Sequence, residues 1–147
     1  MVVLVAYYLV SLKKSPYPVS DFKSFTYRWG FQDSLINSYS SANGNYQYVT
    51  NKDSLVKSEV KLRGNDIIFI HNKISELGFW NLPDTIGSSH ADSKAAVYQF
   101  EFNYRERTKR LLIFSDFDQQ PGLLDSAMQI KSLIQHTIDQ AEARYHP

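Results

Sequence analysis

The chain has 147 residues, of which 43% are hydrophobic and 21% are charged, and its sixteen basic and fifteen acidic residues leave a formal net charge of +1. This length suits one domain that can bury a core of its own. The composition excludes a disordered, a collagen-like or a polytopic membrane protein. The balanced charge gives no electrostatic footprint for nucleic acid, so we expect none as a partner.

The sequence printed contains no cysteine. Within it, disulfides, cysteine-ligated zinc, iron–sulfur clusters and thiol nucleophiles are therefore excluded. Aromatic residues make up 14% of the chain, with ten tyrosines among them. Because aromatic side chains favour β-strands, we expect a tyrosine-rich domain with substantial sheet content.

The first twelve residues, MVVLVAYYLVSL, carry no charge and are followed by Lys13 and Lys14. The run is too short to span a bilayer, which takes about 20 apolar residues, and a secretory signal carries its positive charge before the apolar core. The segment is consistent with the remnant of a longer targeting signal or anchor, with a buried strand, and with a short helix. As a remnant, residues 1–12 would support peripheral or anchored membrane association. We therefore divide the chain into an apolar segment with a proline linker, 1–20, and a single domain, 21–147.

Four strands are predicted in the first half of the domain. Residues 25–29 alternate aromatic with polar side chains and end at Gly30, and 35–39 and 46–50 follow. The Asn43-Gly44 pair between the last two is a strong turn signal. Residues 54–63 alternate apolar and charged side chains, as expected for a strand with one face in water. These segments predict an antiparallel meander.

The spacing then changes to that of a helix. Apolar residues recur every three or four positions from Ile67 to Leu77, after an Asn or Asp that can cap the helix and before Gly78, which suits its C-terminal end. The adjacent Phe79 and Trp80 are expected to pack the helix end onto the sheet. The alternative is that they form an exposed anchor for a partner.

The second half predicts a hairpin and a closing helix. A polar loop spans 85–95, aromatic residues alternate over 98–104, and the chain returns over 111–114. From Pro121 an apolar stripe runs to Tyr145 through Leu123, Ala127, Ile130, Ile134, Ile138 and Ala141. The predicted fold class is α+β: an antiparallel sheet of about five or six strands, meander plus hairpin, with two helices packed on one face.

Motifs for catalysis and metal binding are absent from the sequence. It has no metal-binding histidine pair, nucleophile elbow, phosphate-binding loop or dinucleotide fingerprint. His90, Asp92 and Asp84 share one polar loop, which is too little for a metal site. Asp116 begins a stretch like a calcium loop, but Pro121 and Ala127 replace the required Gly and Glu. We expect no catalytic residue, metal or cofactor, and the sequence leans against an enzyme. His71 and His136 are expected on helix surfaces.

Basic residues gather at the turn of the second hairpin, beside Tyr104: Arg105, Arg107, Lys109 and Arg110. Basic and aromatic side chains together can contact phosphate or single-stranded nucleic acid. The interrupting Glu106 and the overall charge favour the simpler reading, a charged turn that keeps the hairpin from pairing with other chains.

The order of elements resembles a plan found in small uncharacterised bacterial envelope domains, often lipoproteins. The resemblance is carried by Glu76-Leu77-Gly78-Phe79, which ends a helix shortly before Pro83, together with the aromatic hairpin and the closing helix. It would cover about residues 22–145. It implies an N-terminal signal and often a lipid-bearing cysteine, which the printed sequence lacks. It implies no catalytic residues.

Three functions follow as hypotheses. We favour a non-enzymatic binding or protein-interaction domain of the bacterial envelope, in the periplasm or on a membrane, with a cytoplasmic location as the alternative. Tyrosine and tryptophan would provide its contact area. The second hypothesis is a small-ligand binder or enzyme with a spatially assembled pocket, and the third is an inhibitor or immunity-type protein with an acidic face at Asp116, Asp118 and Asp125. The candidate binding residues are Trp29, Tyr46, Tyr48, Phe79, Trp80, His90, Asp92, Arg105 and Arg107.

Overall fold

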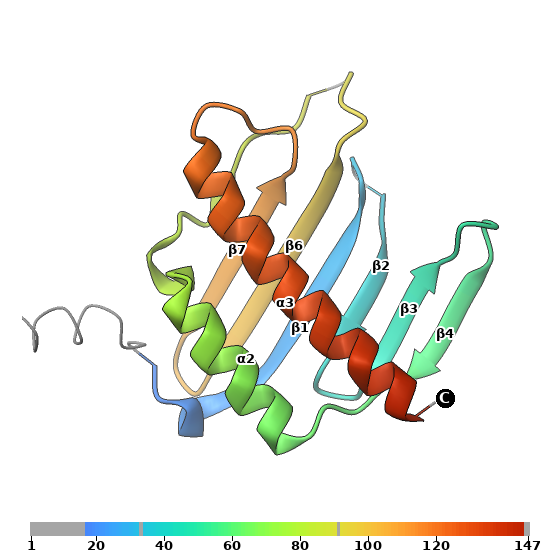
Figure 1. Ribbon diagram of the computed structural model, residues 1–147, viewed down its shortest axis with the longest axis vertical. Helices are drawn as coiled ribbons and strands as arrows, with labels where there is room; N and C mark the ends of the chain where they lie inside the picture. The colour runs from blue at the N-terminus through green and yellow to red at the C-terminus, as the bar shows by residue number, and fades with distance from the viewer. Residues whose placement is uncertain (1–16, 33, 91, 146–147) are drawn as a thin grey trace, which may run out of the picture.

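The computed structural model describes residues 17–32, 34–90 and 92–145 (Figure 1). Residues 1–12, and with them the choice between a targeting remnant and a folded element, lie outside the described residues. Residues 1–16 of the predicted segment 1–20 also lie outside the described residues, so the predicted division of the chain at residue 20 stays a prediction.

The described chain is an α+β domain built on a seven-stranded sheet. The strands are β1 (Phe22–Phe31), β2 (Ser34–Ser40), β3 (Asn45–Val49), β4 (Leu55–Glu59), β5 (Thr85–Ile86), β6 (Ala96–Tyr104) and β7 (Thr108–Phe114). Their order in the sheet is β4-β3-β2-β1-β6-β7-β5, and all neighbours are antiparallel except β5 and β7. The expected count of about five or six antiparallel strands was therefore too low, because the two-residue β5 is too short to produce a periodic sequence pattern.

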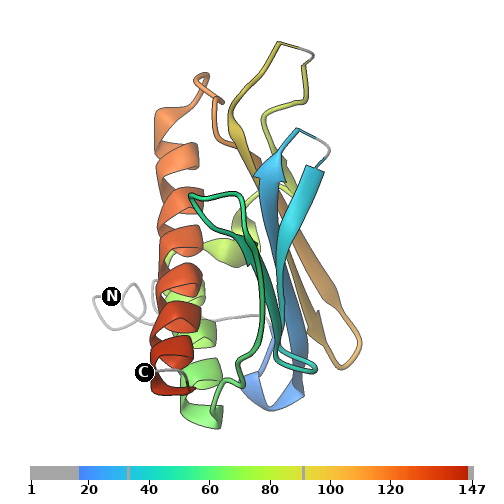
Figure 2. The same cartoon turned by 90° about the vertical axis from the view of Figure 1, so that its right-hand side faces the viewer.

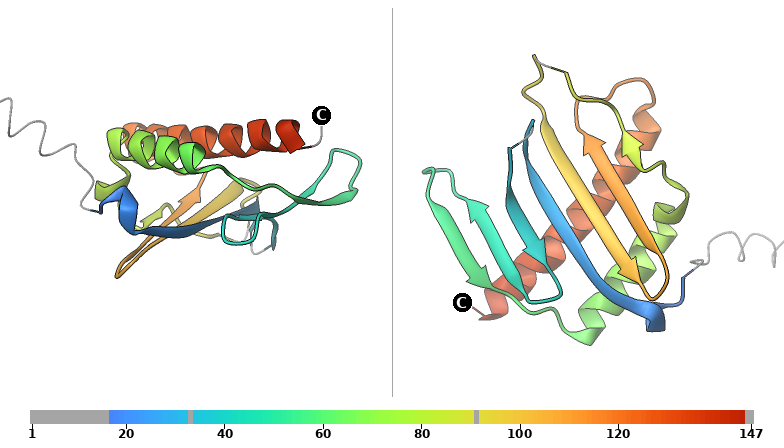
Figure 3. Two further views of the ribbon diagram at one scale, coloured as in Figure 1. Left: turned by 90° about the horizontal axis from the view of Figure 1, so that it is seen from below. Right: turned by 180° about the vertical axis from the view of Figure 1, so that it is seen from behind.

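Two helices, α2 (Gly64–Glu76) and α3 (Pro121–Tyr145), pack on the same face of the sheet, as Figure 2 shows. Short 3-10 turns, η1 (Val19–Asp21) and η2 (Phe79–Asn81), precede β1 and follow α2. No helix of the described residues lies on the opposite face of the sheet (Figure 3). Helix α3 crosses the sheet diagonally, so that the ends of β1, β2 and β6 nearest the β1–β2 turn extend beyond it (Figure 1).

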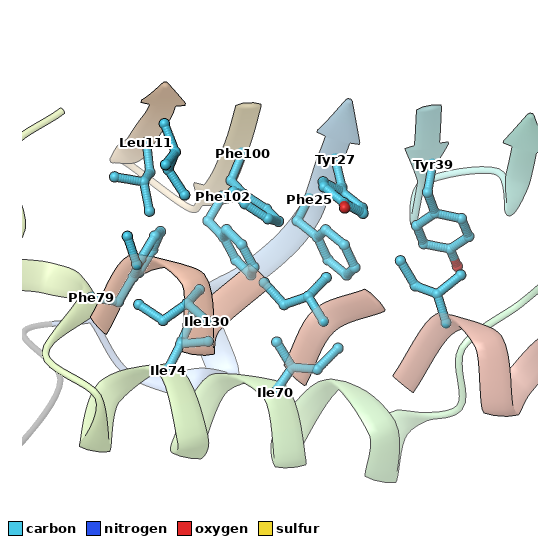
Figure 4. Packing of buried hydrophobic residues seen from close by; sticks show 14 of the residues in the cluster. Phe25, Tyr27, Tyr39, Ile70, Ile74, Phe79, Phe100, Phe102, Leu111 and Ile130 are labelled. Atoms are coloured by element: carbon cyan, nitrogen blue, oxygen red, sulfur yellow. The ribbon is translucent and has the colours of Figure 1, made fainter. Parts of the chain in front are cut away.

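The core lies between the sheet and the helices and is largely aromatic on the sheet side. Phe25 pairs with Phe102 across β1 and β6, and Tyr27 pairs with Phe100, and each pair of rings is stacked. Figure 4 shows these rings facing Ile70 and Ile74 of α2 and Ile130 of α3. Burial of this many large side chains makes the hydrophobic effect the main stabilising contribution.

Two strand ends differ from the expected ones. The strand expected at 54–63 ends at Glu59, because its partner β3 begins at Asn45 and Gly44, opposite Val60, lies in the β2–β3 turn with a φ of 75°. Strand β1 does not end at Gly30 but continues to Phe31. Gly30 lies against the bulged backbone of β2, where an added Cβ would be 2.0 Å from the Ser34 carbonyl oxygen.

The helix ends follow from local capping. The N-cap of α2 is Arg63, two residues before Asn65 and three before Asp66, the expected caps, and its backbone N–H donates to Asp66 Oδ2 at 2.9 Å. Gly78 follows α2 with a φ of 81°, which confirms the expected glycine end. Pro121 is the first residue of α3, as expected, and Arg144 in its last turn reaches Asp66 of α2 at 2.8 Å. In the described part of the chain, no helix combines the length and the apolar character needed to cross a bilayer.

Candidate functional site

An aromatic cleft of about 540 Å³ lies at the end of the sheet where β1 turns into β2 and β6 begins. We call it the Trp29 cleft. Its lining comes from β1, β2 and β6 and from the end of β3 with its following turn: Trp29, Gly30, Phe31, Ser34, Ile36, Asn37, Val49, Thr50, Asn51, Asp53, Ala96 and Tyr98.

Strand register places the two large aromatic residues of the cleft side by side. Trp29 of β1 is paired with Tyr98 of β6 on one side and with Asn37 of β2 on the other. The indole also stacks on the buried Tyr27 ring, with centroids 4.5 Å apart. One side of the Trp29 ring is therefore fixed against the core, and the side chain remains partly exposed.

The rim of the cleft carries two apolar side chains in water. Phe31 is 62% exposed and Ile36 is 52% exposed, which makes them the two most exposed large apolar side chains of the described residues. Their backbone is well anchored, because Asn37 donates to the Trp29 carbonyl at 2.9 Å and accepts from the Val49 N–H at 2.8 Å. The rim is thus apolar and exposed on a fixed frame.

Polar groups border the aromatic surface. Lys131 of α3 lies over the Tyr98 ring, with Nζ 4.9 Å from its centroid, and Thr50, Asn51 and Asp53 supply oxygen and nitrogen atoms on the β3–β4 side. An apolar floor with a few polar groups at its edge is the usual chemistry of a site that binds one apolar or aromatic group and orients it.

The predicted residues Tyr46 and Tyr48 lie farther along the sheet, under α3. Tyr46 is 4% exposed, and its hydroxyl donates to Asp139 at 3.1 Å and accepts from Gln135 at 3.0 Å. Burial raises the pKa of this hydroxyl, so it stays protonated and acts as a structural donor. Tyr48 is partly exposed, and its hydroxyl donates to Glu142 at 3.2 Å.

His90 is brought to Asp116, not to Asp92 or Asp84. Its Nε2 lies 2.7 Å from Asp116 Oδ2, and Ser93 Oγ donates to the same oxygen at 2.9 Å. The hydrogen bonds from Ser93 and His90 lower the pKa of the Asp116 carboxyl. The side chains of His90 and Ser93 therefore both bond to the Asp116 carboxylate and not to each other. An activated serine nucleophile would instead be hydrogen-bonded to the histidine that serves as its base. The pair lines a separate polar cleft of about 310 Å³.

Phe79 and Trp80 close the end of α2 onto the sheet. Phe79 is fully buried and makes an edge contact with Phe102, with centroids 5.2 Å apart. Trp80 is partly buried, packs against Tyr104, and donates its indole N–H to Ser75 Oγ at 2.7 Å. The packing of Phe79 against the sheet matches the structural role expected for this pair.

His71 is buried at 5% exposure, so the expected position on a helix surface was wrong. Its Nδ1 lies 2.7 Å from the hydroxyl of Tyr104, which is itself 5% exposed. The neighbouring Trp80 and Tyr104 rings carry no charge that could stabilise an imidazolium. Burial therefore lowers the pKa of His71.

This shift predicts that the protein loses stability in mild acid. Below the ordinary histidine pKa of about 6.5, the unfolded chain takes up a proton that the folded chain resists, so the free energy of unfolding falls as pH decreases through that value. We expect the urea midpoint to drop between about pH 7 and about pH 5, and His71→Gln to remove part of that drop. The exposed His136 provides the control: His136→Gln should leave the wild-type pH dependence unchanged, and an equal effect of both variants would contradict the prediction.

The basic turn lies at the opposite end of the sheet from the Trp29 cleft. Arg105 and Arg107 are exposed there, and Arg107 lies over the Tyr17 ring at 5.3 Å. The other two members are paired, because Lys109 bonds to Asp84 at 3.0 Å and Arg110 to Glu101 at 3.0 Å.

The three acids of the inhibitor hypothesis do not form one face. Asp116 and Asp118 line the His90 cleft, whereas Asp125 lines a different groove with Leu77. The structure instead gathers Glu59, Asp139 and Glu142 around one groove, from segments far apart in the sequence. Among the described residues, no three histidine or acidic side chains are arranged to hold a metal ion.

Of the predicted binding residues, only Trp29 lines the Trp29 cleft. Phe31, Ile36 and Tyr98 were missed. Phe31 lies two residues after Trp29 on the same strand, so a continued alternation through Gly30 was the available signal. No protein-family model matches the sequence, and the search of curated proteins finds no significant relative, so the assignment of a function rests on the geometry of the site.

Proposed function

We propose that this protein is a non-enzymatic interaction domain that binds an apolar side chain of a protein partner in the Trp29 cleft. The observation that carries the proposal is the exposure of Phe31 and Ile36 at 62% and 52%, at the rim of a cleft whose floor contains Trp29. Exposed apolar residues around an aromatic pocket are typical of a binding hot spot.

The stacking of Trp29 on Tyr27 also supports this proposal. A side chain that is already fixed in the free protein loses little conformational freedom when it binds, so more of the contact energy remains as affinity. The polar groups of Asn51 and Asp53, which border the aromatic surface, would then orient the partner, and the apolar contacts would provide the affinity.

A photo-crosslinking experiment in the organism of origin tests the proposal. A photoreactive amino acid replaces Ser34 at the cleft, or Thr108 at the far end of β7 as the matched control, because both side chains are exposed. We expect one stoichiometric protein partner from position 34 and none from position 108. Partner capture from both positions, or from neither, would contradict the proposal.

The variant Phe31→Ala should then weaken binding of the purified partner about 30-fold, the loss typical of a hot-spot residue of about 2 kcal/mol. Phe31 is preferred to Trp29 as the variant because its exposed ring contributes little to the core. Titration calorimetry gives the dissociation constant, and thermal unfolding checks that the fold is intact. An unchanged affinity would exclude the Trp29 cleft as the anchor.

We also propose that the protein resides in the bacterial cell envelope. The apolar composition of residues 1–12 and the resemblance to envelope domains support this location. Fractionation of cells that express the full-length gene tests it: we expect the protein in the periplasmic or membrane fraction, and recovery in the cytosol would reject it.

A further inference from the structure

Strand β4 is an edge strand whose outer side is available for pairing. Among the described strands, only β3 borders it in the sheet order. The backbone of Ser54 accepts from Thr50, and that of Val60 donates to Gly44, so even-numbered residues between them face β3. The backbone N–H and C=O groups of Leu55, Lys57 and Glu59 consequently point away from the sheet, and an added strand would pair with them.

A groove of about 640 Å³ lies beside this edge, between β4 and the last turns of α3. Val56, Lys57, Ser58 and Glu59 line it from β4, and Asp139 and Glu142 line it from α3. Three carboxylates therefore surround the groove against one lysine. The Tyr48 hydroxyl donates to Glu142 and holds that carboxylate toward the strand. Ser58 Oγ is buried and has no hydrogen-bond partner within the described chain.

We propose that an extended peptide with lysine or arginine at alternate positions adds to β4 as an eighth strand. Side chains alternate between the two faces of a strand, so every second side chain of the peptide would enter the groove beside Val56 and Ser58. A cation there meets the carboxylates of Asp139 and Glu142. This site is separate from the Trp29 cleft, and its test does not depend on the function proposed there.

A second copy of the chain is the less suitable occupant of the same edge. Antiparallel pairing of β4 with another β4 would add no net positive charge to the groove, because Lys57 is accompanied by Glu59 on the same strand. It would also bring the Asp139 and Glu142 carboxylates of both copies toward one another, and like charges across an interface are unfavourable. Charge complementarity therefore selects a basic peptide.

Fluorescence anisotropy with two labelled octapeptides tests the proposal on the full chain. One peptide alternates lysine with threonine, and the other alternates glutamate with threonine. In each peptide all charged side chains therefore lie on one face of the added strand. We expect the lysine peptide to bind and the glutamate peptide to bind at least about 10-fold more weakly, the loss of one charge-assisted hydrogen bond. Equal affinities, or no binding of the lysine peptide, would overturn the proposal.

Three variants separate the backbone contribution from the charge. Lys57→Pro removes an outward-facing N–H and is tolerated on an edge strand, whereas Lys57→Ser removes only the side-chain charge. We expect Lys57→Pro and Glu142→Gln each to weaken the lysine peptide about 10-fold or more, and Lys57→Ser to retain affinity. Retained affinity in Lys57→Pro, with folding checked by circular dichroism, would overturn strand addition. A wild-type dimer in analytical ultracentrifugation that Lys57→Pro dissociates would assign the edge to a second copy and also overturn the proposal.

Discussion

Replacing Phe102 with alanine is expected to destabilise the protein by about 3–5 kcal/mol, the usual loss for a buried phenylalanine. Phe102 is 1% exposed and joins three elements of the core. Its ring stacks on Phe25 of β1 at 4.9 Å and meets Phe79 of η2, which follows α2, at 5.2 Å. The truncation would remove apolar burial and leave a cavity that neither the sheet nor α2 can close. Urea unfolding measures the loss.

Phe31→Ala is the matched control, because it makes the same chemical change at a side chain that is 62% exposed. We expect a change within about 0.5 kcal/mol, as for most surface substitutions. The contrast separates the two roles of aromatic residues in this chain, core packing and surface contact. Similar losses in both variants would mean that Phe31 is part of the core and would remove the main support for the Trp29 cleft as a binding site.

The sequence predicted the core well because burial acts on strong local periodicities. The alternation over Phe100 and Phe102 and the helical stripe through Ile130 and Ile134 each produced the expected buried face. The two proposed binding sites, in contrast, are formed by residues far apart in the sequence. Strand register brings Trp29 next to Tyr98, and α3 brings Glu142 to Tyr48. Such pairings leave no periodic signal in a single sequence.

For the polar residues, the sequence indicated which side chains could form contacts but not which partners they would have. His90, one of the predicted binding residues, contacts Asp116, just after the end of β7, instead of the acids of its own loop. His71 has the polar character of a surface residue, yet Tyr104 satisfies its Nδ1 inside the protein. A polar residue can be buried when a partner satisfies its hydrogen bonds. The partner of His71 lies 33 residues away, so the sequence around His71 did not indicate its burial.

Gly30→Ala is expected to destabilise the protein by about 1–3 kcal/mol, the usual cost of overpacking. The new Cβ would stand 2.0 Å from the Ser34 carbonyl oxygen and 3.0 Å from the Leu35 Cα. Both are backbone atoms, so no side-chain rotation can relieve the contact, and β2 must move away from β1. Because Gly30, Phe31 and Ser34 all line the Trp29 cleft, that movement should also weaken binding of the proposed partner.

Gly122→Ala gives the comparison, because a Cβ at that position in the first turn of α3 meets nothing within 4 Å. Alanine is the better helix former, so this variant should be neutral or more stable by up to about 1 kcal/mol. Thermal and urea unfolding of both variants would show opposite signs if the close approach of β2 determines the need for glycine at position 30. A stable Gly30→Ala protein with unchanged partner binding would mean that the β1–β2 hairpin tolerates a wider spacing, and that the shape of the Trp29 cleft does not depend on it.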